Sequence, residues 1–188
     1  MTIYAETQGK GKDLVLIHGW GMSGNVWESV AAKLSEHYRV TIVDLPGYGR
    51  SAKHHLEHYS LSAVANSLIE VIPEQSIVMG WSLGGMIAMK IALNHAQRLS
   101  QLVLVATSPQ FHLSDDWPHA VDTQILENFA NELASSYRDT ILQFLSIQAL
   151  GSEHARDEIR LLRQKVFRDG EPEEGAVRES LKILQSVS

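Results

Sequence analysis

The sequence predicts an α/β protein, with a parallel β-sheet core in residues 1–109 and an all-helical cap in residues 110–188. Three observations support this prediction. Short apolar segments rich in β-branched residues alternate with helical patterns in the first part, which is typical of βαβ units. The strand signal stops near residue 110, and only helical patterns follow. The chain has 188 residues, 44% of them hydrophobic, which is enough for a substantial core.

Four segments are predicted to be buried strands of this sheet. Each is apolar at nearly every position, as expected for strands that are covered on both faces of a parallel sheet. A further segment, residues 2–9, alternates in polarity and is expected at an edge of the sheet. The buried strands are expected at residues 13–19, 39–47, 76–82 and 99–107.

Helical patterns lie between these strands and throughout the cap. Their apolar residues recur every three or four positions, which indicates one buried face. Three helices are expected between strands, at residues 26–36, 61–72 and 83–95. Four are expected in the cap, at residues 122–137, 139–151, 152–168 and 174–187, and the polar segment 169–175 separates the last two.

Composition argues against several classes of function. The net charge of −6 and the isoelectric point near 5.8 disfavour general binding to nucleic acids or anionic membranes. The sequence has no cysteine, which excludes disulfides, thiolate metal sites and a cysteine nucleophile and fits a reducing compartment. No apolar run is long enough for a membrane span, and the first residues lack the apolar core of a signal peptide. We therefore expect a cytoplasmic protein.

Residues 80–84, Gly-Trp-Ser-Leu-Gly, match the pattern Gly-x-Ser-x-Gly. The pattern lies between a predicted strand and a predicted helix, where its serine forms a nucleophile elbow. Ser82 is therefore the candidate nucleophile. The backbone N–H of Leu83, free at the start of the helix, is a candidate oxyanion donor. We expect Trp81 to form a wall of the acyl pocket, and the alternative is that it packs below the pocket.

The turn His-Gly-Trp-Gly at residues 18–21 follows the first buried strand. Such a turn commonly supplies the second oxyanion donor, here the N–H of Trp20. We expect the Trp20 side chain to line the pocket and His18 to be a buried residue that braces the loop. Asp44, in the turn Asp-Leu-Pro-Gly-Tyr-Gly, is expected to cap that turn rather than to act in catalysis.

Together these motifs resemble the α/β-hydrolase family. The resemblance covers essentially the whole chain, and within the family it is greatest for the carboxylesterases that demethylate pimeloyl-[acyl-carrier protein] methyl ester in biotin synthesis. The core pieces that carry it are residues 14–27, 43–51 and 80–88, in this order and spacing. Further matching pieces, with a mild departure at Thr107, are residues 107–111, 116–118, 144–148 and 151–156.

The resemblance implies a serine carboxylesterase with Ser82 as nucleophile and the N–H groups of Trp20 and Leu83 as oxyanion donors. It implies no metal and no organic cofactor, and it implies an acyl-carrier protein bearing a pimeloyl methyl ester as the partner. One alternative is another α/β-hydrolase that acts on a small ester, thioester or C–C bond. A second is a non-catalytic module that binds acyl groups or a carrier protein. The implied wall of the substrate channel is Phe144, Leu145, Ser146, Ile147 and Gln148.

In this family the catalytic acid and the catalytic histidine follow the cap, after further core strands. No strand-like segment follows residue 107 here, and no histidine follows His154. We therefore expect that the C-terminal core strands and the general base are missing from the chain. The 188-residue polypeptide alone is then expected to show no appreciable esterase turnover. The alternative is a genuinely short protein that has lost catalysis.

Arg156, Arg160 and Arg163 lie on one stripe of a predicted cap helix, at positions i, i+4 and i+7. A basic stripe in an acidic protein is a candidate dock for an acidic partner, as the implied carrier protein would be. The alternative is a solvated face paired with acidic neighbours such as Glu153 and Asp157.

A second polar cluster, His54, His55 and His58 with Glu57, follows the Pro-Gly-x-Gly turn. We expect a solvated loop that leads into a helix, and a metal site is the alternative.

Overall fold

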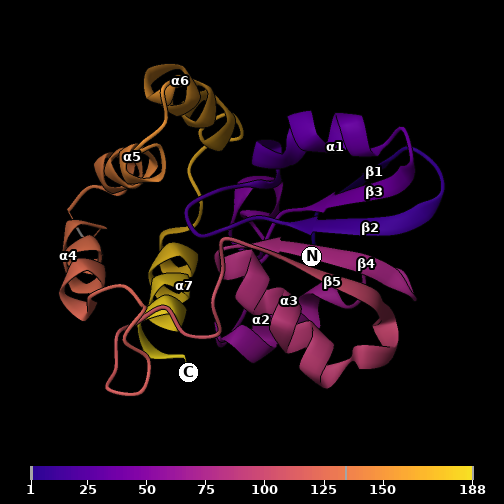
Figure 1. Cartoon of the computed structure of the whole chain (residues 1–188), viewed down its shortest axis with the longest axis horizontal. Coiled ribbons are helices and arrows are strands. Elements are labelled where there is room, and N and C mark those ends of the chain that lie inside the picture. The colour runs from indigo at the N-terminus through magenta and orange to yellow at the C-terminus, as the bar shows by residue number, and fades with distance from the viewer. Residues whose placement is uncertain (1, 134, 188) are drawn as a thin grey trace.

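The computed structural model describes residues 2–133 and 135–187. Its core is a five-stranded sheet with the strand order β1-β3-β2-β4-β5, flanked by helices on both faces (Figure 1). All neighbouring strands are parallel except β1, which is antiparallel to β3 at one edge. The predicted parallel sheet and its edge strand are therefore confirmed. The strands are β1 Ala5–Gln8, β2 Lys12–Ile17, β3 Tyr38–Val43, β4 Ser76–Trp81 and β5 Leu99–Val105.

Alternate residues of the central strands face the two layers of helices. On β2, Leu14 and Leu16 pack with the residues under α1, whereas Val15 and Ile17 pack with those under α2 and α3. This period of two, with both faces buried, explains why the strand is apolar at consecutive positions. The helices of this part are α1 Glu28–Leu34, preceded by a 3-10 turn at Gly24–Trp27, α2 Leu61–Leu68 and α3 Leu83–Asn94.

Several strands end earlier than their apolar patterns predict. The strand expected at residues 39–47 ends at Val43, yet Leu45 and Tyr48 beyond it are fully buried. These residues belong to loops at the carboxyl end of the sheet that the cap covers. Local pattern cannot distinguish such a buried loop from a strand.

The predicted four-helix cap is confirmed. In Figure 1, α4, α5 and α6 form an arm beside the sheet, and α7 lies between this arm and the core. Helix α5 begins at an N-cap serine, because Ser136 Oγ accepts from the N–H of Asp139. The cap helices are α4 Thr123–Leu133, α5 Tyr137–Gln148, α6 Ala155–Val166 and α7 Glu174–Ser186.

Helix α7 joins the cap to the core loops. The hydroxyls of Tyr48 and Ser180 are 2.5 Å apart, and the N–H of Glu173 donates to the carbonyl oxygen of Gly47 at 2.8 Å. Gly47 has φ +78°, and a Cβ there would collide with the side chain of Ala176. A glycine is therefore required for this close approach.

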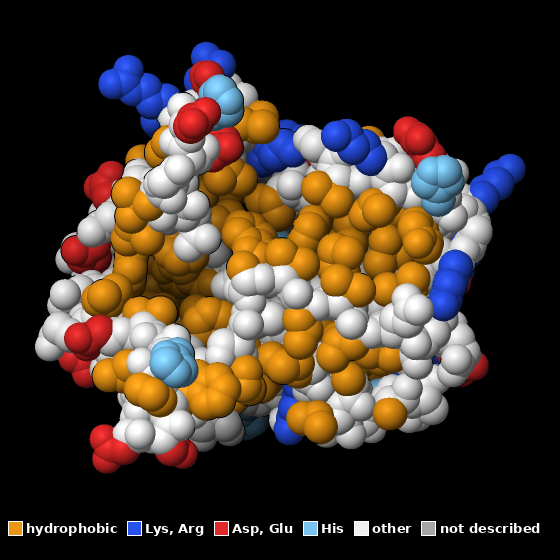
Figure 2. Space-filling view, viewed as in Figure 1, with side chains coloured by type: hydrophobic (Ala, Val, Ile, Leu, Met, Phe, Trp, Pro, Cys, Tyr) orange, Lys and Arg blue, Asp and Glu red, His pale blue; other side chains and the backbone are white. Residues whose placement is uncertain are grey.

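The β5 edge of the sheet presents apolar side chains at the surface. Leu104 is 45% exposed, and Figure 2 shows hydrophobic side chains gathered over the sheet in this view. The same view shows a hollow lined by hydrophobic side chains between the arm and the rest of the molecule. In the part of the chain that the structure describes, no helix has both the length and the apolar character to cross a membrane.

Candidate active site

Ser82 lies between the last residue of β4 and the first residue of α3. Its backbone has φ 55° and ψ −121°, a conformation that residues with a side chain rarely adopt and that the surrounding structure must maintain. Its carbonyl oxygen accepts from Thr107 Oγ1 at 2.7 Å and from the N–H of Gly85 at 2.9 Å, and its own N–H donates to Val105 O at 3.0 Å. Its Oγ has no hydrogen bond within the described residues. The backbone is therefore fixed while the nucleophilic oxygen is free.

The two glycines of the motif allow β4, α3 and β2 to meet at this point. A Cβ on Gly80 would overlap backbone atoms of Gly84, and a Cβ on Gly84 would lie 2.5 Å from the carbonyl oxygens of Ile17 and His18. Backbone atoms cannot move aside as a flexible side chain can. The elbow expected from the sequence is therefore confirmed.

The loop that follows β2 lies beside the nucleophile. A Cβ on Gly19 would lie 3.2 Å from Ser82 Cβ and 3.7 Å from Ser82 Oγ. His18 holds this loop, because its Nδ1 bonds to Gly19 O at 2.9 Å and its Nε2 accepts from the N–H of Leu45 at 3.0 Å. The peptide unit between Gly19 and Trp20 is planar, so fixing its carbonyl also fixes the direction of the Trp20 N–H.

His18 is a brace and not a base. Since Nε2 accepts from an N–H, the proton of a neutral ring lies on Nδ1, and both nitrogens are already used. Burial lowers the pKa of His18, although the carboxylate of Asp44 acts in the opposite direction. The imidazole is therefore neutral at neutral pH, and the expectation that it braces the loop is confirmed.

Asp44 is a buried anchor for two loops. It accepts from the N–H of Gly24 at 2.5 Å and from the N–H and Nε of Arg50 at 2.9 and 2.7 Å. Burial acts to raise its pKa, but the hydrogen bond from Arg50 and the contacts with His18 and Gly24 hold the pKa below its usual value. The carboxylate is therefore ionised and organises the turn, as expected.

The side chain of Trp20 does not line an open pocket, which corrects the sequence-based expectation. It is 1% exposed, and its Nε1 donates to the carbonyl oxygen of Val177 in α7 at 3.0 Å. Its ring meets the ring of Phe144 edge to face at 5.2 Å, and Phe144 meets Phe129 in the same way at 6.0 Å. The Trp20 side chain thus packs into the junction of core and cap, while Gly19, directly before it, lies beside Ser82.

The implied channel wall on α5 does not face one side. A helix turns about 100° per residue, so five consecutive residues go once around it. Phe144 is partly buried and Leu145 is fully buried, whereas Ser146, Ile147 and Gln148 are exposed. The structure therefore directs the first two residues of the segment toward the core and not the last three.

Trp81 is partly buried and contacts another tryptophan of the core. Its ring meets Trp27 edge to face at 6.4 Å. It packs against both hydrophobic clusters of the molecule. Its role as a wall of the acyl pocket stays a prediction.

The arginine stripe of α6 is exposed, and part of it opens on a groove. Arg160 and Arg163 line a groove of about 410 Å³ together with Arg138, Gln164 and Phe167. Arg160 also lies 3.3 Å from Asp157, in agreement with the ion-paired alternative. Arg138 comes from α5, and its guanidinium stacks on the Phe167 ring at 4.4 Å. Sequence periodicity missed it because it lies on a different helix.

The histidine cluster lines a separate pocket of about 530 Å³ against α7. The ionisable residues of this pocket are His54, His55, Glu57, His58, Tyr59, Glu173 and Glu179. No group of three or more metal-binding side chains is arranged in this pocket or elsewhere in the described residues.

No histidine of the described residues is hydrogen-bonded to Ser82.

Comparisons with known proteins agree with this geometry. A family model described as the alpha/beta hydrolase fold matches residues 13–166. The chain is 44% identical over 187 residues to a pimeloyl-[acyl-carrier protein] methyl ester esterase of Aeromonas salmonicida, which covers 100% of this chain and 73% of that relative. It is 43% identical over 185 residues to the esterase of the same name from Vibrio vulnificus, which covers 98% of this chain and 71% of the relative.

Solved structures show the same fold at lower identity. An esterase from Exiguobacterium antarcticum superposes with a TM-score of 0.86 at 24% identity, over 99% of this chain and 70% of that one. A bromoperoxidase from Bacillus anthracis superposes with a TM-score of 0.81 at 23% identity, over 99% and 70% of the two chains. The chain belongs to the alpha/beta hydrolase family.

Proposed function

We propose that this protein is a serine carboxylesterase that hydrolyses the methyl ester of pimeloyl-[acyl-carrier protein] in biotin synthesis. The observation that carries the proposal is the constrained backbone of Ser82, with a free Oγ and the Gly19 loop at its side. This elbow occurs in a chain that is 44% identical to an esterase of that name.

The chemistry follows from the groups around Ser82. The Oγ attacks the ester carbonyl carbon, and the N–H groups of Leu83 and Trp20 stabilise the negative charge that develops on the carbonyl oxygen. Methanol leaves, and water then hydrolyses the acyl-enzyme to release the carboxylate. A general base must take the serine proton and give it to the departing methoxide. None of the described histidines bonds to Ser82, so catalysis is measured on the full-length protein, meaning the product of the complete reading frame.

We infer that residues 1–109 and residues 110–188 have different roles in the reaction. The first part holds the nucleophile and the oxyanion donors, and the second part covers them as a cap. The edge-to-face contacts of Phe144 with Trp20 and Phe129 support an apolar site for the acyl chain beneath the cap. The hollow between the arm and the core is where we place that chain (Figure 2).

The basic groove on the cap supports an acidic carrier protein as the partner. Three guanidinium groups gather there, from Arg138, Arg160 and Arg163, and Arg156 extends the exposed stripe along α6. The net charge of the whole chain is −6, so this surface differs in sign from the average of the protein. Complementary charge favours the encounter and orientation of an acidic partner. The cytoplasm is the compartment that we propose for the reaction.

The deciding experiment incubates full-length protein with pimeloyl-[acyl-carrier protein] methyl ester and follows loss of the methyl group by mass spectrometry. We expect demethylation by the wild-type protein and none by Ser82→Ala. Hydrolysis of small esters or thioesters without demethylation of the carrier substrate would favour a different hydrolase. Binding of the carrier without any turnover, and without labelling of Ser82 by a fluorophosphonate, would indicate a non-catalytic module.

A further inference from the structure

One buried side chain of the core fastens the C-terminal end of α6. Asn25 is 1% exposed, and its Nδ2 donates to Lys165 O at 3.1 Å and to Asp169 Oδ2 at 2.7 Å. Its Oδ1 accepts from Arg168 Nη2. Both kinds of hydrogen-bonding group on the amide are thus committed to the cap. We refer to Asn25, Arg168 and Asp169 as the polar latch.

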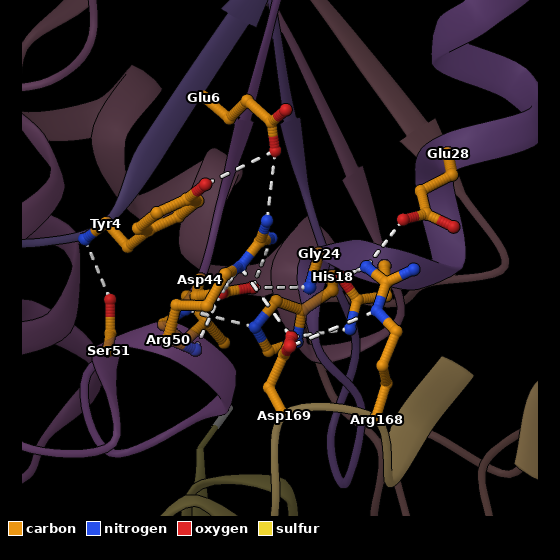
Figure 3. Close-up of polar contacts among 12 residues, drawn as sticks. Tyr4, Glu6, His18, Gly24, Glu28, Asp44, Arg50, Ser51, Arg168 and Asp169 are labelled. Carbon is orange, nitrogen blue, oxygen red and sulfur yellow. Dashed lines mark hydrogen bonds and ion pairs between the residues drawn. The ribbon is translucent and has the colours of Figure 1, made fainter. Parts of the chain in front are cut away.

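Ion pairs tie the polar latch to the core on both sides (Figure 3). Arg168 lies 2.5 Å from the carboxylate of Glu28, and Asp169 lies 3.8 Å from Nε of Arg50. Arg50 in turn pairs with the buried carboxylate of Asp44 at 2.7 Å. Positive and negative groups therefore alternate from the cap into the core, and each supports the next.

The polar latch meets the core directly after residues 19–24, which we call the oxyanion loop. Asn25 lies in the 3-10 turn Gly24–Trp27, only five positions after Trp20. The loop is fixed at its start by His18 and at its end by the bond from the N–H of Gly24 to Asp44. The Trp20 N–H is held between these two anchors, and Asn25 links the second anchor to α6.

The C-terminal end of α6 and the residues that directly follow it bring the polar latch and the basic groove together. Arg163 lines the groove, and Phe167, which also lines it, directly precedes Arg168. A helix transmits a displacement along its axis with little deformation, so a shift at the groove reaches Asn25 through a contiguous set of contacts.

We propose that Asn25 is a positioning residue that makes the alignment of the Trp20 N–H with Ser82 depend on the docking of α6 against the core. The inference rests on the proposed function, because that function gives the Trp20 N–H its role. A carrier protein that binds the α6 arginines acts on the oxyanion loop through this contact.

Two variants test the proposal by exchanging hydrogen-bond roles. Asn25→Asp places a carboxylate at the hydrogen-bonding distance of 2.7 Å from the Asp169 carboxylate, so the two repel and the polar latch opens. The double variant Asn25→Asp with Asp169→Asn restores a donor facing an acceptor between positions 25 and 169, although the bond to Lys165 O stays lost. Ser29→Ala is the matched control, because it removes only the exposed contact from Lys165 Nζ to Ser29 Oγ.

Two measurements on the full-length protein decide the outcome. Asn25→Asp should speed hydrogen exchange of residues 19–24 and lower kcat for a small methyl ester about tenfold with KM unchanged, less than the loss of a complete oxyanion donor. The double variant should move the exchange rate and kcat back toward their wild-type values, and Ser29→Ala should change neither quantity. Faster exchange confined to residues 165–169, or equal impairment of the single and double variants, would overturn the proposal. If the wild-type protein hydrolyses no ester, the proposed function fails, and the exchange data still decide whether Asn25 controls the loop.

Discussion

The hydroxyl of Thr107 donates a hydrogen bond to the backbone carbonyl of Ser82 at 2.7 Å. Thr107 follows β5, so this bond ties the elbow to the neighbouring strand. A Cβ on Gly85 would collide with the same threonine side chain, which shows how closely the two segments approach. The bond therefore supports Ser82, whose own backbone is strained.

Replacing Thr107 by valine should loosen the elbow without unfolding the protein. The Ser82 carbonyl keeps the N–H groups of Gly85 and Met86 as donors, so only one of three bonds is lost. One such bond is worth about 1 kcal/mol, which corresponds to a roughly fivefold slower reaction of Ser82 with a fluorophosphonate. Thr107→Ser keeps the hydroxyl and should react at the wild-type rate. If serine and valine slow labelling equally, packing and not the hydrogen bond supports the elbow.

Gly80→Ala should disrupt the fold at the elbow. The new Cβ would lie 2.5 Å from the carbonyl carbon of Gly84 and 2.6 Å from Cα of Gly85, and both are backbone atoms. We expect a loss of about 3 kcal/mol or more in the free energy of unfolding, measured by urea denaturation. Gly19→Ala is the milder comparison, because the nearest atom to its new Cβ is Ser82 Cβ at 3.2 Å. It should fold but label more slowly, and equal stability of the two variants would contradict this account.

Charge reversal on α6 separates docking from chemistry. Arg156→Glu with Arg160→Glu should raise KM for the carrier-bound substrate about tenfold at low salt and leave hydrolysis of a small free methyl ester unchanged. The difference should shrink as added salt screens the charges. Lys33→Glu on α1 is the control for a change in net charge. Equal effects on the two substrates would show that the arginines do not form a docking surface.

The order of the elements and the elbow were predictable because their signals are local. A strand that is buried on both faces is apolar at consecutive positions, and Ser82 lies at a boundary between strand and helix patterns. The orientation of residues on the cap was not predictable in this way. The resemblance assigned all five consecutive residues 144–148 to the wall of the substrate channel, but a helix presents only some of them to the core.

The polar latch and the groove depend on contacts that no local pattern encodes. Asn25 lies 144 positions before its partner Asp169, and nothing in the surrounding loop sequence marks it. Arg138 joins Arg160 and Arg163 only because α5 packs against α6. Trp20 was expected in a pocket because its strand had ended, yet α7 covers it through the bond to Val177. Each of these features is a product of tertiary packing.

The buried imidazole of His18 should make stability depend on pH. Burial lowers its pKa in the folded state below the ordinary value of 6.5, whereas the unfolded chain titrates near that value. Below pH 6.5 the unfolded state therefore binds more protons than the folded state, and the free energy of unfolding falls as pH decreases toward the folded pKa. One such group contributes up to about 1.4 kcal/mol per pH unit in this window.

The variant His18→Asn isolates this contribution. The asparagine amide can still donate to Gly19 O, but it does not titrate. The wild-type protein should be the more stable of the two at pH 7.5, and its advantage should shrink as the pH is lowered to 5.5 in urea-denaturation experiments. Parallel stability profiles for the two proteins would mean that His18 takes up its proton equally readily in the folded and unfolded states. The brace on the Gly19 carbonyl would then not depend on a neutral ring.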